Sequence, residues 1–295
     1  MALSDNTKGA LLMMCSMAAF TFNDTCVKLL GPEVPLFQML FLRGVASSLM
    51  IWGLAHALGN LRWRIPRRDW GLVALRTCAE IGAAYLFITA LYHMPIANVT
   101  AILQVLPLTV TLGGALLFGE AVGWRRMSAI LAGFLGMLLI VRPGPEGFDL
   151  YAGYALGAVC FVTVRDLSTR RMSAEVPSMT VTLVASLGVM LFAGVASLDT
   201  EWVTLDLHQV ALIGGASVFI LGGYLFSVMV MRLGEVSFTA PFRYSGLLWA
   251  LLLGLVVFGE WPDPTTLLGC VIVVGAGVFT LLRGRKLAQE NSART

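Results

Sequence analysis

The sequence predicts an all-α membrane protein with ten transmembrane helices, arranged as two inverted five-helix repeats around a central cavity. The composition supports this fold class, because 58% of residues are apolar and only 13% are charged, against about 25% charged in typical soluble domains. Ten apolar stretches are long enough to cross a bilayer. A short phrase, FGE, also occurs twice, at 118–120 and again at 258–260, which indicates an internal duplication.

Composition also excludes several classes of function. With only 17 acidic residues in 295, the chain cannot cover a soluble surface with charge, so most of its surface should face lipid. The net charge of +3 gives no indication of nucleic-acid binding. The five cysteines lie inside apolar stretches and predict free thiols, not a disulfide framework or a metal site. We expect no metal and no cofactor.

The first five helices are separated by short connections that contain Pro, Gly or charge. We expect a retained first helix after Lys8, since no signal-peptide cleavage site follows it. GPEVP ends this helix, RWRIPRRD precedes the third helix and HMP precedes the fourth. At about 1.5 Å rise per residue, each stretch can cross most or all of about 30 Å of hydrocarbon. The five segments are 9–30, 34–56, 70–92, 95–118 and 124–142.

The second five helices follow the connection RPGPEG, and GEWPDP separates the last two. We place the division between the two repeats here, so that the first covers 1–145 and the second covers 146–295. The second set of segments is 149–168, 178–198, 207–231, 235–258 and 264–283.

Positive charge predicts the orientation, because cytoplasmic loops of membrane proteins carry an excess of Lys and Arg. If the N-terminus is cytoplasmic and the chain alternates sides, fourteen of the twenty basic residues fall in cytoplasmic segments. Only Lys28 and Arg142 then fall in outer segments, and the other outer loops are acidic or neutral. We therefore expect both termini in the cytoplasm.

The two halves match each other in more than the FGE phrase. In the register that aligns Asp24 with Asp166, Lys28 aligns with Arg170, so a basic residue recurs as well. In the register set by the two FGE phrases, Gln104 aligns with Tyr244. An odd number of helices per half inverts the second copy, which is how many secondary carriers build two related faces around a site near the midplane.

With these features the chain resembles the drug/metabolite transporter superfamily, and within it the EamA-type carriers. The resemblance covers almost the whole chain and rests on the FGE that closes each fourth helix, on RRMSAILAGFLGMLLIVRPG (125–144) and on TAPFRYSGLLWALLLGLVVFGEWPDPTTLLGCVIV (239–273). It implies a carrier of small metabolites in a bacterial inner membrane, often an exporter, as in the aromatic amino-acid (YddG-type) group. FNDTCVKLLG (22–31) and APFRY (240–244) are also similar to S-adenosylmethionine carriers of the same superfamily.

Charged side chains inside the predicted helices are functional candidates, because an ionised group is costly in hydrocarbon. Arg76 and Glu80 share one helix face and can neutralise each other, either as a structural bridge or as a coupling pair. Arg43 lies deep in the second helix and is expected to bridge Asp24. Asp166 lies near the cytoplasmic end of the sixth helix. These five residues are the coupling or charge-pair candidates.

Two prolines predict breaks in the fourth and ninth helices. Pro107 and Pro241 each remove a backbone N–H, which exposes a carbonyl one turn earlier. Membrane helices tolerate such a break where it lines a pathway. Arg243 is the preferred charged substrate contact, because it lies just after Pro241 in this broken region. A mainly apolar pocket with a few polar groups suits an amphipathic molecule, and its expected substrate-binding residues are Tyr85, Gln104, Tyr224, Arg243, Tyr244 and Trp249.

Three functions are weighed. The first is a secondary transporter that exports amino acids or related amphipathic metabolites by alternating access, and the second is an S-adenosylmethionine-type uptake or exchange carrier. The third, a membrane enzyme or structural protein, is disfavoured because His56, His93 and His208 lie far apart in sequence and no nucleophile–base cluster is visible. We expect a non-enzymatic chain whose partners are a small-molecule substrate and the bilayer, without nucleic acid, and which works as a monomer.

Overall fold

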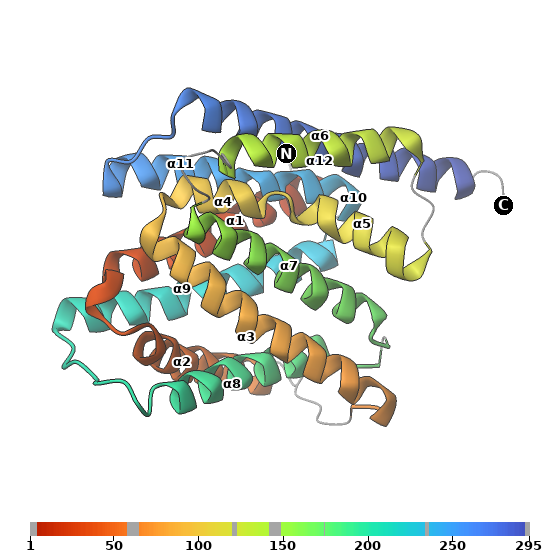
Figure 1. Ribbon diagram of the computed structural model, residues 1–295. Coiled ribbons are helices and arrows are strands. Elements are labelled where there is room, and N and C mark those ends of the chain that lie inside the picture. The colour runs from red at the N-terminus through yellow and green to blue at the C-terminus, as the bar shows by residue number, and fades with distance from the viewer. Residues whose placement is uncertain are drawn as a thin grey trace. The chain divides into compact units, whose positions relative to one another are not determined.

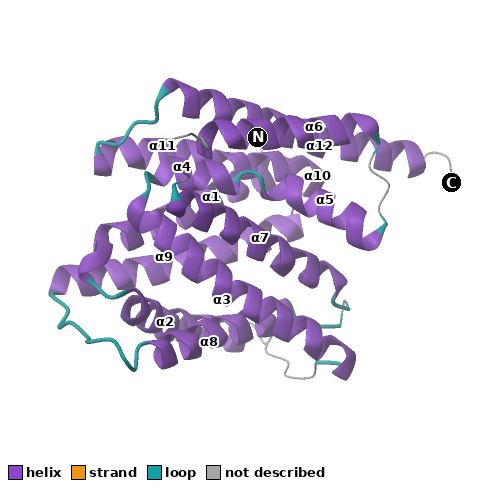
Figure 2. Cartoon of the chain, in the orientation of Figure 1, coloured by secondary structure: helices purple, strands orange, loops and turns teal. Residues whose placement is uncertain are grey.

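The computed structural model describes residues 5–57, 65–119, 123–141, 149–173, 175–233 and 236–292. In these ranges every regular element is a helix, as Figure 2 shows. Four of the basic residues used to predict the orientation, Arg62, Arg64, Arg142 and Arg294, lie outside the described residues, as does Glu120 of the first FGE.

The helix boundaries follow the predicted segments closely. The first half contains α1 (Asp5–Leu30), η1 (Gly31–Glu33), α2 (Leu36–Ala57), η2 (Arg67–Asp69), α3 (Trp70–His93), α4 (Ile96–Leu103), α5 (Leu106–Phe118) and α6 (Trp124–Val141). The second half contains α7 (Leu150–Arg171), α8 (Ser178–Ala196), α9 (Leu207–Leu233), α10 (Val236–Thr239), η3 (Ala240–Tyr244), α11 (Ser245–Phe258) and α12 (Pro264–Ser292). The predicted fourth and ninth helices are therefore each divided, and the last helix extends beyond its predicted end.

Length and hydropathy show a multi-pass membrane protein. Nine helical stretches within the described residues are long and apolar enough to cross a bilayer. The remaining predicted span corresponds to α6, whose apolar part, Met127–Val141, is shorter than the other nine. Ten predicted segments thus correspond to nine full-length candidates and one short apolar helix.

The chain forms two compact units that do not coincide with its two sequence halves. Unit 1 contains residues 1–21, 94–156 and 222–295, and unit 2 contains residues 22–93 and 157–221. Each unit therefore combines segments from both halves. The boundaries between the units fall inside α1, α7 and α9 and directly after α3.

In unit 1, helices that occupy equivalent places in the two halves pack on each other. α6 packs along α12, the fifth helix of the other half, and Figure 1 shows the two side by side. In addition, α4, the first part of the fourth helix, packs on α11, the second part of the ninth. Gly136 and Gly269 permit the close approach of α6 and α12. A Cβ atom at Gly136 would lie 2.8 Å from Ile272, and one at Gly269 would lie 2.6 Å from the carbonyl oxygen of Gly136.

Unit 2 repeats this pattern with α2 and α8, which are the second helices of the two halves. α8 packs against both α2 and α3. Gly44 of α2 lies directly under Met190 of α8, since a Cβ atom at Gly44 would be 2.8 Å from that side chain. A hydrogen bond of 2.8 Å between the hydroxyls of Ser48 and Ser186 joins the same two helices.

The repeated FGE phrase ends a helix in both halves. Gly119 follows α5 with a φ of 67°, and Gly259 follows α11 with a φ of 65°. This left-handed conformation costs an L-residue about 1–2 kcal/mol, whereas glycine adopts it freely. The Gly119 N–H donates to the carbonyl of Gly114, and the Glu260 N–H donates to the carbonyl of Gly254 at 2.8 Å. The glycine is therefore a helix C-cap.

The second FGE also acts at a distance along the chain. The Ile96 N–H, at the first position of α4, donates to Oε2 of Glu260 at 3.2 Å. Because the first N–H groups of a helix have no partner within it, Glu260 satisfies one donor at the start of α4. Ile96 is fully buried. Glu260 thus links the loop after α11 to the helix on which α11 packs.

Candidate functional site

The first candidate feature is the break between α4 and α5. α4 ends at Leu103, residues 104–105 form a turn, and α5 begins at Leu106 with Pro107 in its first turn. Proline is tolerated there, but it has no N–H to offer the carbonyl of Leu103 one turn earlier. Gln104 stands at this break, as the C-cap of α4. Figure 2 shows the break as a short loop within an otherwise helical segment.

A second break lies at the equivalent place in the other half. α10 ends at Thr239, and residues 240–244 form the 3₁₀ helix η3 before α11 begins at Ser245. Pro241 lies in the first turn of η3. In the register set by the two FGE phrases, Gln104 corresponds to Tyr244, the last residue of η3. The helix is therefore interrupted at the same register in both halves.

The two breaks come together inside unit 1. The amide Nε2 of Gln104 lies 3.6 Å from the point that a Cβ atom on Gly246 would occupy. Met17 of α1 contacts the same point at 3.7 Å. Because α4 packs on α11, the half-buried Gln104 amide lies against the first turn of α11.

Tyr244 points elsewhere, towards α12. Only 5% of the residue is exposed, and its hydroxyl occupies the space where a side chain on Gly277 would stand. Among the described residues this hydroxyl has no hydrogen-bond partner. Tyr244, one of the expected substrate-binding residues, is thus buried between η3 and α12.

Arg243 is exposed, in contrast to the buried Tyr244 that follows it. The Arg243 side chain makes no hydrogen bond or ion pair within the part of the chain that the structure describes. Arg243 and Gly246 are three residues apart and therefore lie on one face of the helical segment. This face is the one against which the Gln104 amide lies.

The aromatic candidates divide between the units. Tyr224 on α9 contacts Phe20 edge to face, with ring centroids 5.5 Å apart, in unit 1. Trp249 on α11 is half-buried and also belongs to unit 1. Tyr85 stacks on Phe37 at 6.0 Å in unit 2. Gln104, Tyr224, Arg243, Tyr244 and Trp249 therefore share a unit, and Tyr85 belongs to the other one.

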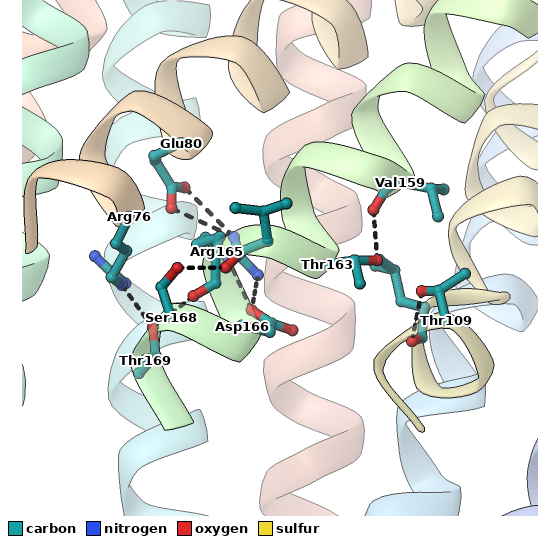
Figure 3. Close-up of polar contacts among 11 residues, drawn as sticks. Arg76, Glu80, Thr109, Val159, Thr163, Arg165, Asp166, Ser168 and Thr169 are labelled. Atoms are coloured by element: carbon teal, nitrogen blue, oxygen red, sulfur yellow. Dashed lines mark hydrogen bonds and ion pairs between the residues drawn. The ribbon is translucent and has the colours of Figure 1, made fainter. Parts of the chain in front are cut away.

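Unit 2 contains Asp24, Arg43, Arg76, Glu80 and Asp166, and two of these charged candidates, Glu80 and Asp166, contact Arg165. Figure 3 shows the guanidinium of Arg165 between two carboxylates. Nε and Nη2 both lie 2.9 Å from Oδ1 of Asp166, and Nη1 lies 3.4 and 3.5 Å from the two oxygens of Glu80. The side chains of Arg165, Glu80 and Asp166 are 24%, 19% and 30% exposed. Asp166 is the tighter partner of Arg165 and Glu80 the looser one.

Arg76 does not pair with Glu80 in the described structure, although the two residues share a helix face. Its Nε donates to the hydroxyl of Thr169 at 3.0 Å, and its Nη1 donates to the carbonyl of Val181 at 3.3 Å. The hydroxyl of Thr169 in turn donates to the carbonyl of Arg165 at 2.8 Å. Arg76 therefore binds neutral groups on α7 and α8, and Glu80 obtains its positive partner from α7.

These contacts form a seam between α3 and α7. As the residue number rises along α3, the residue number of the contacting residue on α7 falls, so the two helices run antiparallel. The polar contacts lie towards the start of α3. Further along α3 the contacts involve glycines, at which a Cβ atom would lie within 3 Å of the facing side chain. Just outside the two helices, Asp69 of η2 binds Ser173. The pairs between α3 and α7 are, in order, Arg76–Thr169, Glu80–Arg165, Gly82–Phe161 and Leu86–Gly157.

Asp24 belongs to a second polar chain in unit 2. The buried Asn23 donates its amide Nδ2 to Oδ1 of Asp24 at 2.8 Å and accepts a hydrogen bond from Nη1 of Arg43 at 3.3 Å. The expected bridge between Arg43 and Asp24 therefore passes through the amide of Asn23. Asp24 and Asp166 are equivalent in the two halves, and each is bonded by the side chain that precedes it.

Sequence reasoning missed the roles of Asn23, Thr169 and Glu260. The register that aligns Asp24 with Asp166 also aligns Asn23 with Arg165, and this could have identified Asn23. Thr169 and Glu260 had no comparable signal, because their partners lie 93 and 164 residues away.

Comparison with known proteins gives relatives that are named as transporters. The S-adenosylmethionine uptake transporter of Rickettsia bellii is 25% identical, over 97% of this chain and 97% of its own. The pseudopaline exporter CntI of Pseudomonas aeruginosa is 26% identical over 90% and 93% of the two chains. The riboflavin transporter of Vibrio cholerae is 26% identical over 92% of each.

Fold comparison agrees with this. A solved crystal structure superposes with a TM-score of 0.65 over 95% of this chain and 99% of that one, at 18% identity, which shows a shared fold. The EamA-like transporter family matches twice, at residues 7–142 and 150–282. The duplication inferred from FGE is therefore the family's own repeat, and the chain is a transporter, not an enzyme. With both repeats matched and the helical segments in place, this protein belongs to the EamA-like transporter family.

Proposed function

We propose that this protein is a secondary carrier that moves amino acids or related small amphipathic metabolites across a bacterial inner membrane by alternating access. The paired helix breaks in unit 1 carry the proposal. Secondary carriers commonly bind their substrates where discontinuous helices of two inverted repeats meet. The breaks at Gln104 and at residues 240–244 occupy the same register of two repeats. The predicted central cavity and function as a monomer are parts of this proposal.

Export of an amino-acid-type metabolite is the first version of the proposal. The resemblance to amino-acid exporters supports it, and a relative named as an exporter covers 90% of this chain. The cargo then binds near Gln104 and Arg243, with Tyr224 and Trp249 in the same unit. Polar groups of this kind fix the orientation of a ligand in a mainly apolar site.

S-adenosylmethionine uptake or exchange is the second version. Four relatives with this name align over 97% of the chain. S-adenosylmethionine is itself an amino-acid derivative with a planar aromatic base, so the same site suits both versions. A carboxylate would favour its sulfonium cation, so the replacement of Glu80 or Asp24, both in unit 2, distinguishes the two versions.

The orientation proposed for the carrier places both termini in the cytoplasm. The excess of basic residues in alternate loops supports it. A cysteine placed at Glu146, outside the described residues, should then react with an impermeant thiol reagent in intact cells. Reaction only after permeabilisation contradicts this orientation.

The function is tested with purified protein in liposomes. The liposomes are preloaded with unlabelled S-adenosylmethionine or with a panel of amino acids, and exchange for the labelled compound is followed with and without a proton gradient. Saturable counterflow with any of these compounds supports the carrier and identifies its cargo. If a proton gradient drives net accumulation, coupling through Asp24, Glu80 or Asp166 is supported, and counterflow insensitive to the gradient removes the coupling. Absence of counterflow for every compound refutes the proposed cargo class.

A further inference from the structure

We propose that the substrate of this carrier bears a carboxylate, which Arg243 and Gln104 bind together at the helix breaks of unit 1. The inference rests on the proposed function and names the group that the site recognises. Arg243 is an exposed cation in a candidate membrane span that starts at Ala240.

The position of Arg243 calls for an anion. It lies three residues after the start of the candidate span at Ala240 and eight residues after the start of the predicted ninth segment at residue 235. An ionised side chain within a membrane span is costly unless it finds a partner or water. Within the described residues Arg243 has no ion pair and no hydrogen bond, in contrast to Arg43, Arg76 and Arg165, which all have partners.

Gln104 supplies a second donor on the same face. Its amide lies against Gly246, which is three residues after Arg243 and therefore on the same side of the segment. In the described structure the Gln104 side chain makes no hydrogen bond either. A guanidinium and an amide can together donate to both oxygens of a carboxylate, and charge-assisted bonds of this kind are the strong ones.

The surroundings of these two groups leave them available to a ligand. Glycine at 246 leaves room for the Gln104 amide, because any side chain there would meet it. Tyr244 is turned away and buried against α12, so it does not compete for the ligand. Pro107 has no N–H to offer the carbonyl of Leu103, which lies next to Gln104 in the chain and suits the ammonium group of an α-amino acid.

A carboxylate site distinguishes among the candidate cargoes. Amino acids and S-adenosylmethionine carry a carboxylate next to an ammonium group, whereas riboflavin carries no carboxylate. A carboxylate-binding site therefore favours the first two compounds over the third.

The test compares each acid with a matched analogue that lacks the carboxylate. Transport in liposomes is measured for S-adenosylmethionine against its decarboxylated form, and for phenylalanine against phenylalaninamide. The wild-type ratio of kcat/KM, acid over analogue, should exceed one. In Arg243→Gln this ratio should fall about 10- to 100-fold, mainly through KM, and Arg243→Lys should keep part of it. Because the ratio is taken within each variant, a reduced amount of folded protein does not change it.

Two further variants sharpen the result. Gln104→Leu should lower the same ratio about two- to tenfold, as expected for one neutral hydrogen bond. Arg125→Gln is the matched control, because Arg125 is also an exposed arginine of unit 1 but lies over Trp124 at the start of α6. Its ratio should equal that of the wild type.

Four outcomes overturn the inference. If acid and analogue are transported equally, or if Arg243→Gln slows both by the same factor, Arg243 does not bind the carboxylate, although the carrier function stands. If Arg243→Gln changes transport only in step with the anionic lipid content of the liposomes, Arg243 serves a lipid phosphate. If the wild type moves riboflavin but none of the acids, the carrier stands and the carboxylate site does not. Failure to move any probe refutes the proposed cargo class itself.

Discussion

Replacing Arg165 should destabilise the protein far more than replacing Glu80, although the two residues form one ion pair. Arg165 also binds Asp166, and more closely, with contacts of 2.9 Å against 3.4 and 3.5 Å to Glu80. Arg165→Gln therefore leaves two carboxylates without this cation, whereas Glu80→Gln leaves the arginine bound to Asp166.

The magnitudes follow from burial. Removing one partner of a fully buried pair costs about 3–5 kcal/mol. These side chains are 19–30% exposed, so solvent screening reduces the expected cost of Arg165→Gln to about 1–3 kcal/mol. Glu80→Gln loses one long ion pair and should cost about 1 kcal/mol or less.

The free energy of unfolding can be measured by titrating the purified protein with a denaturing detergent in mixed micelles. The double variant supplies the sharpest comparison. Once Arg165 is Gln, replacing Glu80 by Gln removes an uncompensated charge and should be neutral or stabilising. If Glu80→Gln costs as much in that background as in the wild type, the pair does not account for the role of Glu80. Arg67→Gln, an exposed site in unit 2, should leave the stability unchanged.

Three other predictions concern unit 1. Gly259→Ala should lower the free energy of unfolding by about 1–2 kcal/mol, because alanine is strained at a φ of 65°; an unchanged value would contradict the C-cap. Glu260→Ala should speed hydrogen exchange at the Ile96 N–H, whereas Glu260→Gln, which keeps an acceptor, should do so less; equal exchange in both variants would argue against the cap. Tyr244→Phe should leave stability unchanged or raised, because it removes a buried hydroxyl without a partner among the described residues; a loss of more than about 1 kcal/mol would indicate a bound water or ligand there.

Much of the fold could be predicted from the sequence, because the signals that place membrane helices are local. Long apolar stretches, Gly and Pro in the connections and the recurrence of FGE predict helix ends that agree with the structure within a few residues at most boundaries. Pro107 and Pro241 indicate where two helices are interrupted, since a missing N–H acts within one turn of its own position. The sequence does not indicate how complete these interruptions are, with a turn in one half and a five-residue 3₁₀ helix in the other.

The candidate site was less predictable, because partners of charged and polar groups depend on helices that meet far along the chain. Arg76 and Glu80 are four residues apart and are expected partners from that spacing, yet Glu80 binds Arg165, 85 residues away. Tyr244 was expected beside the pathway from its polarity and register. The rotation of η3 relative to α12 instead buries its ring on Gly277, and no local pattern encodes that rotation.

The sequence by itself determined that this chain is a duplicated, ten-segment membrane carrier, because hydropathy, charge asymmetry and repetition are properties of the chain alone. Only the tertiary structure decided that each compact unit combines equivalent helices of both repeats, with α6 against α12 and α2 against α8. It also decided that the Gln104 amide lies against Gly246 while the Tyr244 ring lies on Gly277. The physical reason is that the apolar composition of a segment is enough to place it in the membrane as a helix. The direction of each side chain, in contrast, depends on which neighbouring helices leave room for it.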